Sequence, residues 1–179
     1  MKNKKKLSIK SIVAIGIGAA LFFLLGRFVA VQSPIPDTTI NIQYGILSVI
    51  SVIYGPLSGV LCGFLGHTLI DMSGDILWWS WIIASSVFGL IVGFVRRKID
   101  IGSGKFGVKE IFHFNIFQMV AHIAAWIVVA PVLDILIFND ATEMVFMQGA
   151  FAATTNIVTT AFVGTGLLTI YTKMKKVRA

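Results

Sequence analysis

Six apolar stretches run along the chain, separated by short segments that are richer in polar residues, glycine or proline. They cover residues 9–31, 40–54, 56–70, 79–95, 111–137 and 145–172. A helix needs about 20 residues to cross the hydrocarbon core of a bilayer, so the second and third stretches are short. The pattern predicts an all-α membrane protein in which six transmembrane helices form one compact bundle.

The second and third stretches could instead form one long helix that bends at Gly55-Pro56. The basic residues favour two helices, because 14 of the 15 Lys and Arg residues fall within residues 2–10, 96–109 and 173–178. Six crossings place these three clusters on one side of the membrane, whereas five crossings would divide them. Since cytoplasmic flanks carry an excess of Lys and Arg, we expect six crossings and cytoplasmic N- and C-termini.

The composition agrees with a membrane protein. Of the 179 residues, 56% are hydrophobic and 13% are charged, which leaves too little polar surface for a soluble globule of this size. The net charge of +7 would suggest nucleic acid in a soluble protein, but the basic residues lie beside apolar stretches. We expect membrane lipid as a partner, no nucleic acid, and a single integral membrane domain over residues 1–179.

The sequence lacks three common catalytic motifs. It contains no Gly-rich phosphate loop with a lysine, no nucleophile elbow and no paired-histidine metalloprotease helix. Its one cysteine, Cys62, lies in an apolar stretch, and no set of metal ligands is complete. We expect no enzymatic activity, metal or cofactor, and any active transport would need an external ATPase.

The first helix carries Arg27, the one cation outside the three basic clusters. At about 100° per residue, Gly16, Ala20 and Arg27 share one face, and Ala14 and Gly18 share another. An arginine in a membrane helix faces the bundle interior or a wet cavity, or reaches toward the interface. The first reading predicts an outward face at Ala14 and Gly18, where small residues would let a partner helix approach closely.

Polar and aromatic residues gather toward the outer half of the predicted helices. Acidic residues, tryptophans and amides from several helices converge there, which favours a binding cavity over simple helix pairing. Tyr44 or Trp79 would stack on a planar ligand. The candidate binding residues are Arg27, Asn41, Tyr44, His67, Asp71, Trp79, His122, Gln148 and Asn156.

These features together resemble a known family. The segments that carry the resemblance are Ile12-Val-Ala-Ile-Gly-Ile-Gly-Ala-Ala-Leu-Phe-Phe followed by Arg27, Tyr54-Gly-Pro, Gly63-Phe-Leu-Gly-His67 with Asp71, and Trp78-Trp79-Ser80-Trp81. Nearly the whole chain resembles the S components, the membrane-embedded substrate-binding subunits of energy-coupling factor (ECF) vitamin transporters. Within that family it is most similar to the riboflavin, hydroxymethylpyrimidine and pyridoxine branch.

The resemblance implies six helices in a bacterial cell membrane and a small vitamin held near the outer face. It also implies a coupling membrane protein and two ATP-binding subunits as partners. The family's Ala-x-x-x-Ala docking motif matches Ala14 and Gly18, and the family mechanism implies that the whole subunit rotates in the membrane to carry its vitamin inward.

Three hypotheses follow. The first is a substrate-binding subunit for a small heterocyclic vitamin or precursor. The second is a self-sufficient carrier or channel that acts as a homo-oligomer. The third and weakest is a small intramembrane enzyme that uses His67, Asp71 and His122, which lack an accompanying nucleophile.

Overall fold

Helices dominate the computed structural model, which describes residues 7–74 and 76–177. The first half contains α1 (Ile9–Leu24) with the π-helical turn η1 (Leu25–Val29), α2 (Gln43–Tyr54) and α3 (Pro56–Met72). The second half contains α4 (Trp79–Gly93) with the 3₁₀ turn η2 (Phe94–Arg97), α5 (Val108–Ile123), the π-helical turn η4 (Ala124–Val129), α6 (Ala130–Phe138) and α7 (Thr142–Val177). A short 3₁₀ turn, η3 (Ile101–Ser103), lies in the loop before α5.

Helical segments lie at all six predicted apolar stretches. Within the described part of the chain, four are long and apolar enough to cross a membrane: Ile9–Val29, Trp79–Arg97, Val108–Phe138 and Thr142–Val177. The other two, α2 and α3, have 12 and 17 residues. The mainly helical architecture is therefore confirmed, whereas six full crossings and the sidedness of the termini remain predictions.

A sharp turn separates α2 from α3. Gly55 has φ 97°, a left-handed conformation that glycine adopts without steric cost, and Pro56 follows as the first residue of α3. The predicted break at Gly55-Pro56 is thus a reversal of the chain, and not a bend in one long helix.

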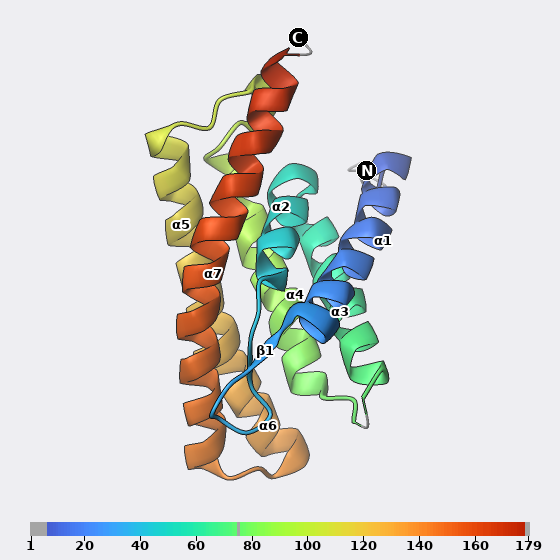
Figure 1. Cartoon of the computed structure of the whole chain (residues 1–179), viewed down its shortest axis with the longest axis vertical. Helices are drawn as coiled ribbons and strands as arrows, with labels where there is room; N and C mark the ends of the chain where they lie inside the picture. The colour runs from blue at the N-terminus through green and yellow to red at the C-terminus, as the bar shows by residue number, and fades with distance from the viewer. Residues whose placement is uncertain (1–6, 75, 178–179) are drawn as a thin grey trace, which may run out of the picture.

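The helices alternate in direction, so the start of α1 and the end of α7 lie toward the same end of the bundle (Figure 1). The basic residues gather at this end: Arg96 lies against Gly55, and Lys175 and Lys176 lie beside the loop that contains Gly102. Part of the predicted pattern cannot be placed, because Lys2, Lys4, Lys5, Lys6 and Arg178 lie outside the described residues.

An aromatic layer fills the middle of the bundle. Tyr44 meets Phe22, Phe88 and Trp126 edge to face, with ring centroids 5.2, 5.2 and 5.5 Å apart. All four rings are at most 1% exposed. Edge-to-face pairs favour a fixed arrangement of the rings, so this layer holds the helices that contribute to it in fixed positions relative to one another.

The face assignment of α1 was wrong. Ala14 and Gly18 are buried against α2 and α3, where a side chain at Gly18 would meet Ile50 and Cys62. Gly16 is exposed and has nothing near its missing side chain. The outward small-residue face therefore carries Gly16 and Ala20.

The error arose because Arg27 was used to define the inward face of the helix. Arg27 is exposed, as Gly16 is, and it lies in the turn η1 at the end of the helix, yet its side chain lines the cavity. A long arginine side chain can reach a cavity from an outward backbone position, so its helical phase did not report the buried face of α1.

Candidate functional site

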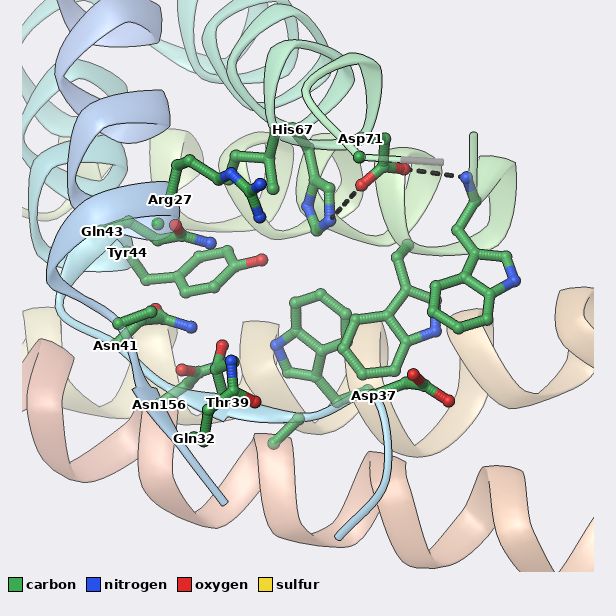
Figure 2. A pocket seen from close by; sticks show the side chains of 18 of the residues that line it. Arg27, Gln32, Asp37, Thr39, Asn41, Gln43, Tyr44, His67, Asp71 and Asn156 are labelled. Carbon is green, nitrogen blue, oxygen red and sulfur yellow. Dashed lines mark hydrogen bonds and ion pairs between the residues drawn. The ribbon is translucent and has the colours of Figure 1, made fainter. Parts of the chain in front are cut away.

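A cavity of about 430 Å³ lies among the helix ends opposite the basic residues, and Figure 2 shows the side chains that line it. The turn η1, the starts of α2 and α4, the end of α3, η4 and the middle of α7 contribute to it, together with residues 30–42 between η1 and α2 and the loop between α3 and α4. Its lining residues are Gly26, Arg27, Ala30, Gln32, Asp37, Thr39, Asn41, Gln43, Tyr44, His67, Ile70, Asp71, Gly74, Ile76, Trp78, Trp81, Trp126, Ala152 and Asn156. Six helical segments and two connecting segments thus converge on this cavity.

Three buried side-chain amides are the most informative lining groups. Asn41, Gln43 and Asn156 are 9%, 3% and 2% exposed, and the side-chain carbonyl oxygen of each lacks a hydrogen-bond partner. Figure 2 shows the amides of Asn41 and Gln43 directed toward the cavity. A buried polar group without a partner is costly, so these amides favour a bound molecule with complementary donors and acceptors.

Aromatic rings form one wall of the cavity. Trp81 and Trp126 lie with ring centroids 5.0 Å apart, and Tyr44 lies 5.5 Å from Trp126. The Trp81 indole N–H donates to the Asp134 carboxylate over 3.1 Å, which fixes that ring. A wall of fixed aromatic faces suits a flat ligand better than a flexible one.

A hydrogen-bonded chain of side chains runs from the cavity into α4. The Tyr44 hydroxyl and His67 Nδ1 both lie within hydrogen-bonding distance of Ser85 Oγ, at 2.8 and 2.6 Å. His67 Nε2 lies 3.7 Å from Asp71 Oδ1, and the other Asp71 oxygen accepts from the Trp78 backbone N–H over 2.8 Å. Asp71 thus fixes the loop that precedes α4 as well as facing the cavity.

Charge in the cavity is mixed. Arg27 points in from η1, and Asp37 and Asp71 line other parts of it (Figure 2). Among the described residues, Arg27 has no carboxylate within 4.0 Å. Over residues 7–74 and 76–177, which the structure describes, the lining therefore has one cation against two carboxylates, which does not favour a strongly anionic molecule.

Residues 30–42, called the strap below, cross the cavity mouth. The strap is a hairpin in which β1 (Val31–Gln32) pairs antiparallel with β2 (Thr39–Ile40). Gln148 of α7 donates from its side-chain nitrogen to the Pro36 carbonyl over 3.0 Å. A smaller cavity of about 260 Å³, lined in part by Asp37, Asp134 and Gln148, adjoins this contact.

The structure brings together six of the nine predicted binding residues: Arg27, Asn41, Tyr44, His67, Asp71 and Asn156. It separates the other three from the main cavity. Trp79 is 43% exposed and lies outside the lining, His122 lies fully buried behind Tyr44 and Trp126, and Gln148 holds the strap.

Gln43, Trp81 and Trp126 are among the lining residues that sequence reasoning did not select. Gln43 is next but one to Asn41, and this polar pair at a predicted helix start was a usable signal. Trp81 was indistinguishable from its two neighbours by sequence. Within the part of the chain that the structure describes, no group of three His, Cys, Asp or Glu residues is arranged to hold a metal ion.

A bundle of apolar helices with a polar and aromatic cavity at one end defines a membrane protein that binds a small solute. The sequence model described as "ECF-type riboflavin transporter, S component" matches residues 6–173. The chain therefore belongs to this family of transporter S components, and its family and fold are not those of an enzyme.

Close relatives share nearly the whole chain. Proteins called "UPF0397 protein" from Lactobacillus johnsonii and Enterococcus faecalis are each 46% identical, and the matches cover 98% and 97% of this chain and 97% and 96% of the relatives. A Staphylococcus aureus relative is 42% identical over 94% of this chain and 92% of its own length.

A solved structure shares the fold. The crystal structure at 2.1 Å of the S component for biotin from an ECF-type ABC transporter superimposes with a TM-score of 0.63. The match covers 98% of this chain and 95% of that one at 14% sequence identity, so it supports the fold alone.

Proposed function

We propose that this chain captures a small, planar heterocyclic vitamin or precursor outside the cell and delivers it inward with a coupling protein and two ATP-binding subunits. The observation that carries the proposal is the composition of the cavity. Three buried amides, whose side-chain oxygens lack hydrogen-bond partners, line it together with a wall of aromatic rings. Aromatic faces stack on a flat ring, and primary amides pair with the donors and acceptors at its edge.

The charges narrow the class of ligand. One arginine against two carboxylates favours a molecule without strong negative charge. Riboflavin, pyridoxine and hydroxymethylpyrimidine all have a flat ring with polar substituents and neither a carboxylate nor a phosphate group. These three types are the proposed ligands, and the membership of the riboflavin-transporter family supports them.

Equilibrium binding to the purified protein tests this function. Wild-type protein is expected to bind one of the three vitamins, and Asn156→Ala to weaken that binding about tenfold, because the ligand loses a buried hydrogen-bonding partner. Thr154→Ala is the matched control, since Thr154 lies on the exposed side of α7 and its hydroxyl donates to the Ala150 carbonyl. Equal affinity in Asn156→Ala and wild type would exclude the cavity as the binding site.

We further propose that the exposed small-residue face of α1 contacts the coupling protein. Gly16 and Ala20 lie between the exposed side chains of Ile12, Val13 and Ile17, so a partner helix can approach the backbone there. This face replaces the one predicted at Ala14 and Gly18, which is buried.

A pair of glycine variants tests this contact. Gly16 and Gly166 both have open space around a potential side chain, so leucine at either position should leave the fold intact. Gly16→Leu is expected to abolish co-purification with the coupling protein and ATPases, and Gly166→Leu to preserve it. Normal assembly of Gly16→Leu would mean that the partner docks elsewhere.

A further inference from the structure

His122 lies directly behind the aromatic wall without reaching the cavity. The residue is fully buried on α5, one turn before Trp126. Its ring packs 4.2 Å from the Phe88 ring at 31° and 5.3 Å from the Tyr44 ring at 81°. Neighbouring rings therefore hold the imidazole on at least two sides.

Hydrogen bonds define which imidazole nitrogen carries the proton. The Trp126 indole N–H can only donate, and it lies 3.1 Å from His122 Nδ1, so Nδ1 must accept. The proton of the neutral ring is then on Nε2, which lies 3.1 Å from Thr160 Oγ1 on α7 and donates to it. One neutral tautomer satisfies both contacts, and a ring protonated at Nδ1 would lose its bond to Trp126.

The hydrogen bond from Trp126 to His122 affects the cavity because Trp126 is itself a lining residue. This indole lines the cavity, and its N–H is directed away from the lining toward His122. A tryptophan without such an acceptor would have to bury its N–H unpaired or rotate, and rotation would change the face that a flat ligand meets. Thr160 extends this series of hydrogen bonds to α7, the helix that also carries the cavity residue Asn156.

We propose that His122 is a positioning residue: in its Nε2–H form it sets the orientation of the Trp126 ring against which the ligand stacks, and it does not touch the ligand. This inference rests on the proposed function for the identity of the ligand. The orientation of Trp126 itself is a property of the protein without ligand.

Three substitutions separate the roles of the His122 ring. His122→Phe keeps a ring of similar size and removes the acceptor. His122→Asn loses ring packing but places an amide oxygen near the position of Nδ1. Thr160→Val keeps the shape of Thr160 and removes the acceptor for Nε2–H, so it serves if a His122 variant does not fold.

The first readout is the indole N–H resonance of Trp126 in ligand-free protein, assigned by its absence from Trp126→Phe. We expect the resonance to move upfield in His122→Phe, to stay near its wild-type position in His122→Asn, and to shift partway in Thr160→Val. An unchanged resonance in both His122→Phe and Thr160→Val overturns the proposal, whatever the ligand.

The second readout is a double-mutant cycle on affinity for riboflavin, pyridoxine or hydroxymethylpyrimidine, whichever the wild type binds. His122→Phe is expected to weaken binding about fivefold and His122→Asn less than about twofold, as the loss of one hydrogen bond implies. In the Trp126→Phe background, His122→Phe should change affinity less than about twofold, because its effect passes through Trp126.

If the losses of affinity in His122→Phe and Trp126→Phe multiply in the double mutant, the two residues act independently and the positioning role is overturned. If wild-type protein binds none of the three vitamins, the proposed function fails, and the resonance of Trp126 still decides the role of His122. The two hypotheses can therefore fail separately.

Discussion

At the scale of single residues, the cavity depends on Gly26 as much as on the groups that face it. Gly26 lies in η1, and a side chain there would overlap the Gln43 amide and the Ile70 side chain. The missing side chain leaves room for a buried amide at the cavity edge.

Gly26→Ala is expected to displace the Gln43 amide and weaken vitamin binding about tenfold, since overpacking a filled site costs about 1–3 kcal/mol. Equilibrium binding to purified protein measures the effect. Gly16→Ala serves as control because nothing lies near that position, and its affinity should equal that of wild type. Wild-type affinity in Gly26→Ala would mean that Gln43 does not take part in binding.

Several polar cavity residues were predictable because polar groups in apolar helices are rare and stand out. Asn41, His67, Asp71 and Asn156 were identified in this way, and all four line the cavity. Trp79 and His122 were not separable from true lining residues, because burial and the direction of a side chain near a helix end depend on tertiary packing. Gln148 lies near the cavity but bonds to the strap instead of lining the main cavity.

At the scale of elements, the strap is fixed to the bundle by few contacts. Its Pro36 carbonyl accepts the hydrogen bond from Gln148, and Thr38 is buried at the same bend. Asp37, between them, has φ 54°, a conformation that costs free energy for a residue with a side chain. The strap is thus held in a strained conformation over the cavity mouth.

Gln148→Ala removes the hydrogen bond between the strap and α7. We expect the bound vitamin to dissociate about fivefold faster, because one neutral hydrogen bond contributes about 1 kcal/mol. Washout of labelled vitamin from immobilised protein measures the rate. Thr154→Ala, which alters the exposed side of α7, should leave the rate unchanged. An unchanged rate in Gln148→Ala would show that this bond does not retain the ligand.

Helix positions were predictable from apolar runs, and so was the break between α2 and α3, because Gly55 and Pro56 have defined backbone preferences. The faces of α1 were not. Arg27 is exposed, as Gly16 is, but its long side chain still reaches the cavity, so the use of Arg27 as a marker of the inward face assigned Gly16 to the wrong side.

At the scale of the whole molecule, the separation of charge defines two ends of the bundle. Described basic residues near η2, η3 and the end of α7 gather at one end, and the cavity with Arg27 lies at the other. With the basic end in the cytoplasm, the cavity faces outward, as capture of an external vitamin requires.

Cysteine labelling on intact cells tests the number of crossings. In a Cys62→Ser parent, Ser8→Cys and Ser103→Cys are expected to react with a membrane-impermeant maleimide only after the membrane is opened, and Asp140→Cys to react in intact cells. All three positions are exposed in the structure. Labelling of Ser8→Cys and Ser103→Cys from opposite sides would mean that α2 and α3 do not form two crossings.

The packing of the helices predicts how a bound molecule would affect the rest of the bundle. The helix α1, which continues into η1, packs on α2 and α3, whereas α7 packs on α2, α5 and α6. Arg27 of η1 and Asn156 of α7 therefore approach the cavity from different groups of packed helices. A molecule that bonds to both sides closes this gap and becomes a structural part of the bundle. Amide hydrogens of η1 and of the middle of α7 should then exchange more slowly together once the cavity is filled.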